Sequence, residues 1–186
     1  MKLIIGLGNP GSLYINTRHN TGFIILDNYA SCNNFLIDKK KFDGLYQIVL
    51  VNNEQVIFLK PQTFMNCSGE CIIKFINYFK ISIDNILVVY DDLDIEIGKY
   101  KLKDNGRSGG HNGISNIIIH VCTQKFKRLK VGISNDKNIA TKNYVLGKFT
   151  LEQQKKLHCV INTSCDIIND FISLSFDQLM NKYNKR

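Results

Sequence analysis

Titratable and amide side chains that could do chemistry gather in three regions of the chain. These are residues 8–20, residues 63–69, and residues 90–94 taken together with 108–113. Each region either follows an apolar run or contains several glycines. Loops that follow strands carry much of the functional chemistry of α/β folds, because a rigid sheet holds them in place. We therefore expect these regions to meet in one site.

His19 has the side chain best suited to proton transfer. A neutral imidazole accepts a proton near physiological pH, but a general base of this kind needs a carboxylate or carbonyl to fix its tautomer. Asp91 ends an apolar, β-branched run and is the partner that we predict. A solvated or helix-capping role for His19, which stands between Arg18 and Asn20, remains the alternative at this point. We expect His111, in a glycine-rich loop, to be structural.

Each of the three regions also carries an asparagine, and these are Asn9, Asn66 and Asn112. An amide side chain donates and accepts hydrogen bonds without titrating. Several of them at one site suit the recognition of carbonyls and amides and the orientation of a water molecule. Neighbouring glycines allow a substrate to approach closely. The pattern favours a site that recognises carbonyl groups beside a general base.

Two other chemistries fit the same regions less well. Residues 6–11 match Gly-x-Gly-x-x-Gly after a predicted strand, which is the dinucleotide-binding fingerprint. The motif continues as an Asn-Pro-Gly turn rather than a helix, and no acidic residue ends a second strand about 20 positions later. Asp91, Asp92 and Asp94 could bind a cation through oxygen, but their spacing differs from that of a calcium-binding loop. We therefore predict no metal site.

The hydrophobic pattern alternates between strands and helices. Apolar runs predict strands over residues 2–7, 45–51, 55–60, 85–90, 99–103 and 126–133. Helical spacing predicts helices over residues 21–30, 68–79, 114–121, from 151 onward, and 167–183. Ser68 is a plausible N-cap, and residues 150–153 resemble a capping box. We predict a single α/β domain over residues 1–186, with a twisted mixed sheet, helices on both faces and helices at the C-terminus.

Composition sets the class of protein. The chain has 186 residues and a net charge of +8, which favours an acidic partner such as nucleic acid. No apolar run reaches the ~18 residues of a membrane span, and no signal peptide opens the chain, so we expect a cytoplasmic protein. The six cysteines are expected to be reduced. Cys67 could act as a nucleophile with His19, but no cysteine-hydrolase signature surrounds it.

The whole chain resembles the bacterial peptidyl-tRNA hydrolase family. The motifs that carry the resemblance, in the family's order and spacing, are GLGNPG (6–11), Tyr14, TRHN (17–20), TFMNCSG (63–69), DDLD (91–94) and SGGHNG (108–113). The resemblance implies an enzyme that cleaves the ester between a peptide and the 3′ ribose of tRNA. It also implies a monomer with a mixed central sheet and with no metal or organic cofactor.

The resemblance also implies roles for individual residues. His19 would be the general base that activates water, and Asp91 would orient it. Asn9 would contact the peptide part of peptidyl-tRNA. The residues that would contact the substrate around the tRNA end, or shape the pocket wall, are Tyr14, Phe64, Met65, Asn66 and Asn112. Those that would contact phosphate are Lys101, Lys103, Arg107, Arg128 and Lys130.

The chain departs from the family pattern near its last predicted strand. Lys130 stands where arginine is common, and Ser134, Asn135 and Asp136 follow where a glycine and a basic-proline pair are usual. An ammonium still neutralises phosphate but lacks the planar fork of a guanidinium. Two rival functions remain: a basic RNA-binding module in which His19 only caps a helix, and a nucleotide-binding protein that uses residues 6–11.

Overall fold

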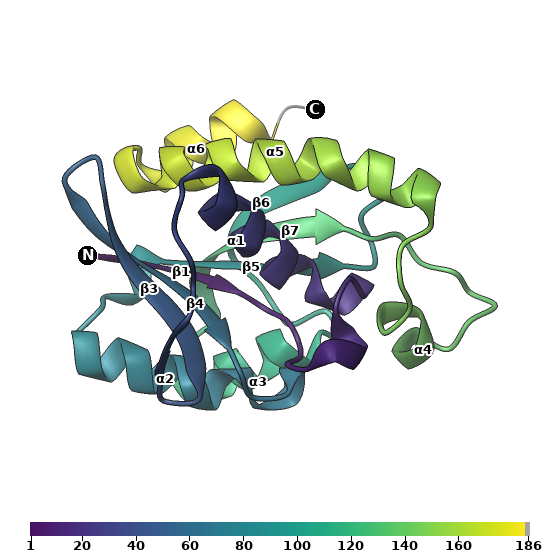
Figure 1. The fold of residues 1–186 in the computed structure, drawn as a ribbon, viewed down its shortest axis with the longest axis horizontal. Helices are drawn as coiled ribbons and strands as arrows, with labels where there is room; N and C mark the ends of the chain where they lie inside the picture. The colour runs from purple at the N-terminus through teal and green to yellow at the C-terminus, as the bar shows by residue number, and fades with distance from the viewer. Residues whose placement is uncertain (185–186) are drawn as a thin grey trace.

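Seven strands form one mixed sheet in a computed structural model of the chain, which describes residues 1–184 (Figure 1). The strand order is β2-β3-β4-β1-β5-β7-β6. The central strands β4, β1, β5 and β7 run parallel, and antiparallel strands complete both edges. The strands are β1 (Lys2–Gly6), β2 (Lys39–Lys41), β3 (Gly44–Val51), β4 (Glu54–Pro61), β5 (Ile86–Asp92), β6 (Tyr100–Asn105) and β7 (Lys125–Gly132). The predicted mixed sheet is confirmed.

Helices cover both faces of the sheet, as predicted (Figure 1). On one face lie α1 (Thr21–Cys32), α5 (Leu151–Ser173) and α6 (Phe176–Tyr183). On the other lie α2 (Ser68–Phe79) and α3 (Asn112–Val121). Short helical turns, η1 (Ser12–Tyr14), η2 (Arg18–Asn20), η3 (Met65–Cys67) and η4 (Ile83–Asn85), and a short helix, α4 (Thr141–Val145), occupy the connections. Within residues 1–184 we find no helix with the length and apolar character that a membrane crossing requires.

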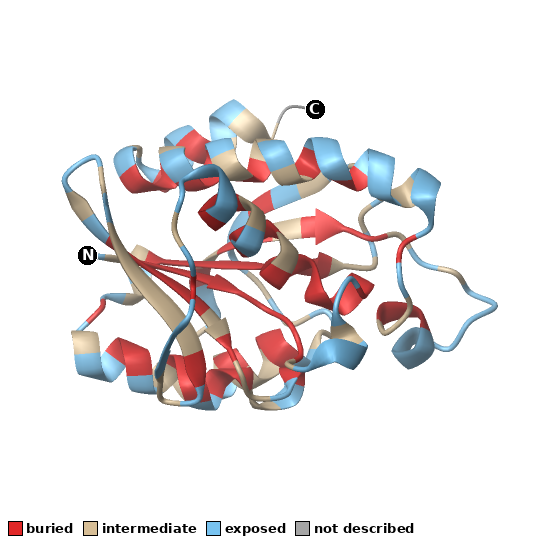
Figure 2. Cartoon of the chain, viewed as in Figure 1, coloured by how far each residue is buried: buried red, intermediate tan, exposed pale blue. Residues whose placement is uncertain are grey.

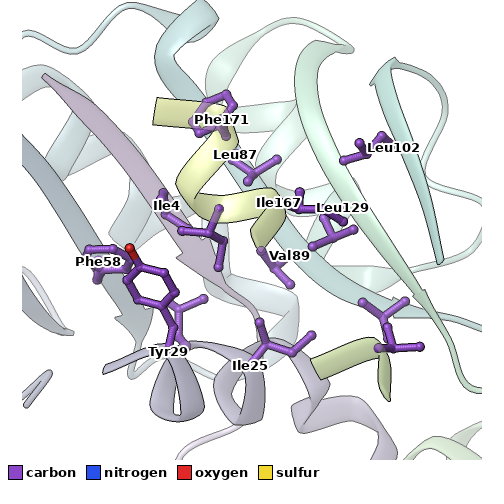
Figure 3. Close-up of a cluster of buried hydrophobic side chains, with 14 of the residues drawn as sticks. Ile4, Ile25, Tyr29, Phe58, Leu87, Val89, Leu102, Leu129, Ile167 and Phe171 are labelled. Atoms are coloured by element: carbon purple, nitrogen blue, oxygen red, sulfur yellow. The ribbon is translucent and has the colours of Figure 1, made fainter. Parts of the chain in front are cut away.

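Strand alternation divides the core into two layers. In β5, Leu87 and Val89 pack against the α1 and α5 side, whereas Val88 and Tyr90 pack against the α2 and α3 side. The same alternation holds in β1 and β4, whose side chains are buried on both faces (Figure 2). Figure 3 shows the layer under α1 and α5. A sheet buried on both faces is a rigid base for the loops at its ends.

The backbone of α1 touches the backbones of β1 and β5. A Cβ on Gly22 would lie 2.3 Å from the amide nitrogen of Leu7 and 2.4 Å from the carbonyl oxygen of Val89. A Cβ on Gly6 would lie 2.4 Å from the carbonyl oxygen of Gly22. The first glycine of the 6–11 motif therefore has a packing role, and the same contact fixes the start of α1, which follows His19.

The structure differs from the predicted elements in a few places. Cys67, not Ser68, is the N-cap of α2. Ser68 is the first residue of the helix, and its hydroxyl donates to the carbonyl oxygen of Met65 at 2.9 Å. The predicted capping box at Thr150 is confirmed. The predicted helix over 167–183 is two helices, because Ser175 starts α6 with a capping box of its own. Neither β2 nor α4 was predicted, since both are short and mostly polar.

Candidate active site

The three polar regions meet in one cavity of about 800 Å³. It lies where β1, β4 and β5 end, which is where open α/β sheets bind ligands. Its lining residues are Asn9, His19, Phe64, Met65, Asn66, Asp91, Asp92, Leu93, Asp94, Ser108, Gly109, Gly110, His111, Asn112, Thr141, Lys142, Val145 and Leu146. Seven of the eight residues predicted to catalyse or to contact the substrate are among them.

His19 and Asp91 form a hydrogen-bonded pair. Nδ1 of His19 lies 3.0 Å and 2.9 Å from the two carboxylate oxygens of Asp91. Asp91 is 2% exposed. Burial alone would raise the pKa of Asp91, but the charges of His19 and His111 and their hydrogen bonds outweigh it and hold the pKa well below its usual range. An ionised Asp91 accepts a hydrogen bond from Nδ1–H of His19. In the neutral ring the other nitrogen, Nε2, then keeps its lone pair.

Contacts of the neighbouring residues hold the segment that carries His19 in place. It lies in η2, between β1 and α1, and the Thr21 hydroxyl donates to the carbonyl oxygen of Arg18 at 2.7 Å. The amide N–H of Arg18 donates to the carbonyl oxygen of Gly147 at 3.0 Å, and its guanidinium stacks on Tyr144. The helix-capping alternative for His19 fails, because Asn20 is the N-cap of α1 and the His19 ring is hydrogen-bonded to Asp91.

His111 is the part of the site that the sequence did not reveal. Its Nε2 lies 3.1 Å from a carboxylate oxygen of Asp91, so two imidazoles share one carboxylate. Its other nitrogen, Nδ1, accepts a hydrogen bond from the amide of Ile114 and caps α3. The Tyr90 ring packs edge-on against the His111 ring, with centroids 4.9 Å apart. His111 is structural, as expected, but it also contacts the predicted catalytic pair.

Asn9 is held in one orientation. Its side-chain oxygen accepts a hydrogen bond from the amide of Met65 at 2.8 Å. Asn20, which the sequence did not single out as a site residue, exchanges two hydrogen bonds with the Asn9 backbone, at 2.8 Å and 3.0 Å. With its oxygen engaged, the amide nitrogen of Asn9 is available to donate to a ligand in the cavity.

The rim of the cavity carries the remaining predicted contact residues. Asn66 and Asn112 line the cavity with exposed side chains. Phe64 is 58% exposed and meets Tyr14 in an edge-to-face contact with ring centroids 6.2 Å apart. Tyr14 itself does not line the cavity. Exposed aromatic rings at a cavity mouth suit the stacking of unpaired bases.

The five predicted phosphate contacts lie outside the cavity on or beside β6 and β7. Lys101 pairs with Lys130 across these strands, and Lys103 pairs with Arg128, so all four side chains start from one face. Lys101, Lys103 and Arg107 are exposed, and Lys130 forms an ion pair with Asp92. The prediction for Arg128 is wrong: its side chain is buried and binds backbone carbonyls.

Among residues 1–184, His19, Asp91 and His111 form the group that could hold a metal ion, since their ligand atoms lie within 4.8 Å of one another. Imidazole and carboxylate suit several divalent transition metals. A cation on Nδ1 of His19 would displace the proton shared with Asp91, and the neutral ring would then carry its proton on Nε2. The group can serve as a base or as a metal site, but not as both at once.

Comparison with known proteins finds relatives that match nearly the whole chain. The sequence model of the family described as Peptidyl-tRNA hydrolase matches residues 3–186. The peptidyl-tRNA hydrolase of Lactobacillus gasseri is 51% identical over 99% of this chain and 100% of its own length. That of Listeria monocytogenes serovar 1/2a is 45% identical over the full length of both chains.

Solved structures extend the likeness to the fold. The crystal structure of peptidyl-tRNA hydrolase from Acinetobacter baumannii superposes with a TM-score of 0.92 at 32% identity. It covers 99% of this chain and 94% of its own. A complex of peptidyl-tRNA hydrolase with N-propanol gives the same TM-score at 33% identity. The chain belongs to the peptidyl-tRNA hydrolase family of enzymes.

Proposed function

We propose that this chain hydrolyses the ester between the peptide and the 3′ ribose of peptidyl-tRNA, with His19 as general base and water as nucleophile. One observation carries the mechanism: Nδ1 of His19 is hydrogen-bonded to the buried carboxylate of Asp91, while the ring borders the cavity. That arrangement directs the free lone pair of Nε2 to the substrate side.

The reaction needs one proton to move twice. Nε2 of His19 takes a proton from water as the water oxygen attacks the ester carbon. The tetrahedral intermediate then expels the ribose 3′ oxygen, which is protonated by the His19 imidazolium as it leaves. Asp91 stabilises the imidazolium between the two steps, and the amides of Asn66 and Asn112 donate to the carbonyl oxygen as it gains charge. A positioned base of this kind contributes roughly 10²–10⁴-fold to the rate.

Asn9 gives the site a means of selecting blocked substrates. Its free amide nitrogen can donate to the carbonyl of the first peptide bond. Free aminoacyl-tRNA has an α-ammonium group and no carbonyl at that position. The buried oxygen contact with Met65 prevents the amide from turning round to suit the ammonium group.

The tRNA part is bound by charge and stacking. Tyr14 and Phe64 stack the unpaired end of the acceptor strand, and Lys101, Lys103, Arg107 and Lys130 neutralise phosphates. In this scheme the chain acts as a monomer and uses no organic cofactor or metal. We place the reaction in the cytoplasm, where peptidyl-tRNA forms.

The proposal is tested by incubating the protein with N-acetyl-aminoacyl-tRNA and, in parallel, with unblocked aminoacyl-tRNA. We expect release of the N-acetyl-amino acid only, in magnesium buffer and equally in the presence of a zinc-selective chelator. Binding of tRNA without cleavage by folded protein would contradict the proposal and favour an RNA-binding module. Loss of cleavage on chelation would overturn the metal-free mechanism.

A further inference from the structure

Arg128 is a buried cation without an acidic partner. The residue is 1% exposed and takes part in none of the ion pairs of residues 1–184. Taking a charge out of water costs free energy that only good hydrogen bonds can offset. The placement of this side chain in the core therefore calls for an explanation other than general stability.

Three hydrogen bonds join the Arg128 guanidinium to main-chain oxygens. One terminal nitrogen, Nη1, donates to the carbonyl of Arg107 at 3.0 Å. The other, Nη2, donates to the carbonyls of Gly106 and Gln124. The guanidinium lies over the ring of Phe126, 4.2 Å from its centroid. Gly106 and Arg107 precede α3 and Gln124 follows it, so one side chain ties together the connections at both ends of that helix.

The connection before α3 needs an anchor. Residues 106–111 lead from β6 to Asn112 and include three glycines with positive φ, 143° at Gly106, 59° at Gly109 and 81° at Gly110. A Cβ on Gly109 or Gly110 would meet no atom within 4 Å, so packing does not hold that part of the loop. The loop is fixed at its start by Arg128 and at its end by the contact of His111 with Asp91.

A second route links Arg128 to the same histidine. Burial raises the pKa of Tyr90 to about 12, against the opposing effect of the Arg128 charge and hydrogen bond. Arg128 on β7 pairs with Val88 on β5, so the side chains of Arg128 and Tyr90 leave the same face of neighbouring strands. The Tyr90 ring in turn packs edge-on against His111. The guanidinium thus supports His111 through the loop backbone and through Tyr90.

We propose that Arg128 is a positioning residue for hydrolysis. Its buried guanidinium anchors the 106–111 loop, and the anchored loop holds His111 against Asp91 and keeps Asn112 at the cavity. The proposal rests on the proposed function of the site. A lysine could not replace the arginine fully, because a single ammonium cannot reach carbonyls on both sides of α3 as a planar fork does.

The test compares Arg128→Met and Arg128→Lys with the wild-type chain. Arg128→Met is expected to fold, since it removes a buried charge that has no acidic partner and leaves an apolar side chain in its place. We expect kcat on N-acetyl-aminoacyl-tRNA to fall at least about tenfold with little change in KM. Amide hydrogen exchange in residues 106–113 should become faster while exchange in β1 and β5 stays the same. Arg128→Lys should give a kcat and a loop exchange rate between those of the wild-type chain and those of Arg128→Met.

Lys103→Met is the matched control, because Lys103 pairs with Arg128 across the strands but is exposed. It should raise KM and weaken its salt dependence without affecting loop exchange. If the Arg128 variants exchange their loop amides at the wild-type rate, the proposal is overturned. It is also overturned if these variants change KM and its salt dependence but leave kcat unchanged. If Arg128→Met does not fold, Arg128→Lys must show the faster loop exchange. Absence of hydrolysis by the wild-type chain would refute the proposed function, yet exchange would still test the anchor.

Discussion

At the scale of single residues, the site depends on one carboxylate. Asp91 receives hydrogen bonds from both His19 and His111. The sequence predicted His19 and Asp91, because a histidine and an aspartate at element ends are recognisable by type and position. The second contact was not predictable, because a histidine beside glycines carries no periodic signal and its partner is set by the path of the loop.

Acidification tests the charge state of Asp91. Because the pKa of Asp91 is lower in the folded chain than in the unfolded chain, its ionised form adds stability above the unfolded value of about 4. That stability is lost as the pH falls from there toward the folded pKa. We expect urea unfolding to show a wild-type advantage over Asp91→Asn that shrinks between about pH 5 and pH 3. An advantage independent of pH would contradict this.

Asn9→Asp keeps the hydrogen-bond acceptor of the Asn9 side chain and removes its donor. The substituted carboxylate still accepts from the amide of Met65 but has no N–H to donate to a peptide carbonyl. We expect the ratio of kcat/KM for N-acetyl-aminoacyl-tRNA over free aminoacyl-tRNA to fall by about tenfold or more, as for a lost hydrogen bond of about 1.5 kcal/mol. An unchanged ratio would remove Asn9 from substrate selection.

At the scale of elements, the packing of α1 on the sheet positions His19. The backbones of Gly22, Leu7 and Val89 approach too closely to admit a Cβ. Gly22→Ala should lower the free energy of unfolding by about 1–3 kcal/mol or more, because this overpacking pushes α1 away from the sheet. It should also lower kcat, since His19 moves with the helix start.

Urea unfolding measures the first effect, with Ser31→Ala as the control. Ser31 lies on the exposed side of α1, where a substitution changes stability by about 0.5 kcal/mol or less. Equal stabilities for Gly22→Ala and the control would show that the close approach is not maintained in solution.

Elements with a strong pattern were predictable, and short polar ones were not. Buried strands such as β1 and β5 are continuous apolar runs, and the capping box at Thr150 marks the start of α5. By contrast, β2 consists of three lysines, and α4 has five residues with little apolar pattern. Yet α4 supplies part of the cavity wall, through Thr141 and Val145. Its contribution arises from tertiary packing, which no local pattern records.

At the scale of the whole molecule, part of the net charge of +8 is concentrated on β6 and β7. The β6 and β7 register sets Lys101 beside Lys130 and Lys103 beside Arg128. The resemblance to the family implied all four as phosphate contacts, and their residue types carry the required charge. Burial is not readable from residue type, and it removes Arg128 from the set.

Salt dependence measures how this surface acts on tRNA. A lysine that neutralises one phosphate contributes a slope of about 0.7–0.9 to the dependence of log affinity on log salt. Lys103→Gln should reduce the slope by about that amount. Lys40→Gln, on β2 at the opposite edge of the sheet, should leave it nearly unchanged. Equal slopes for the two variants would argue against a phosphate contact at Lys103.

The most direct test of the central claim is a single-turnover measurement on His19→Ala with N-acetyl-aminoacyl-tRNA, with enzyme in excess. Binding is measured separately, and His158→Ala, an exposed position on α5, serves as the control. If His19 is the base, the cleavage rate of the bound complex falls about 10²–10⁴-fold while affinity for tRNA changes little. Cleavage of the bound complex at the wild-type rate would show that His19 does not activate the water.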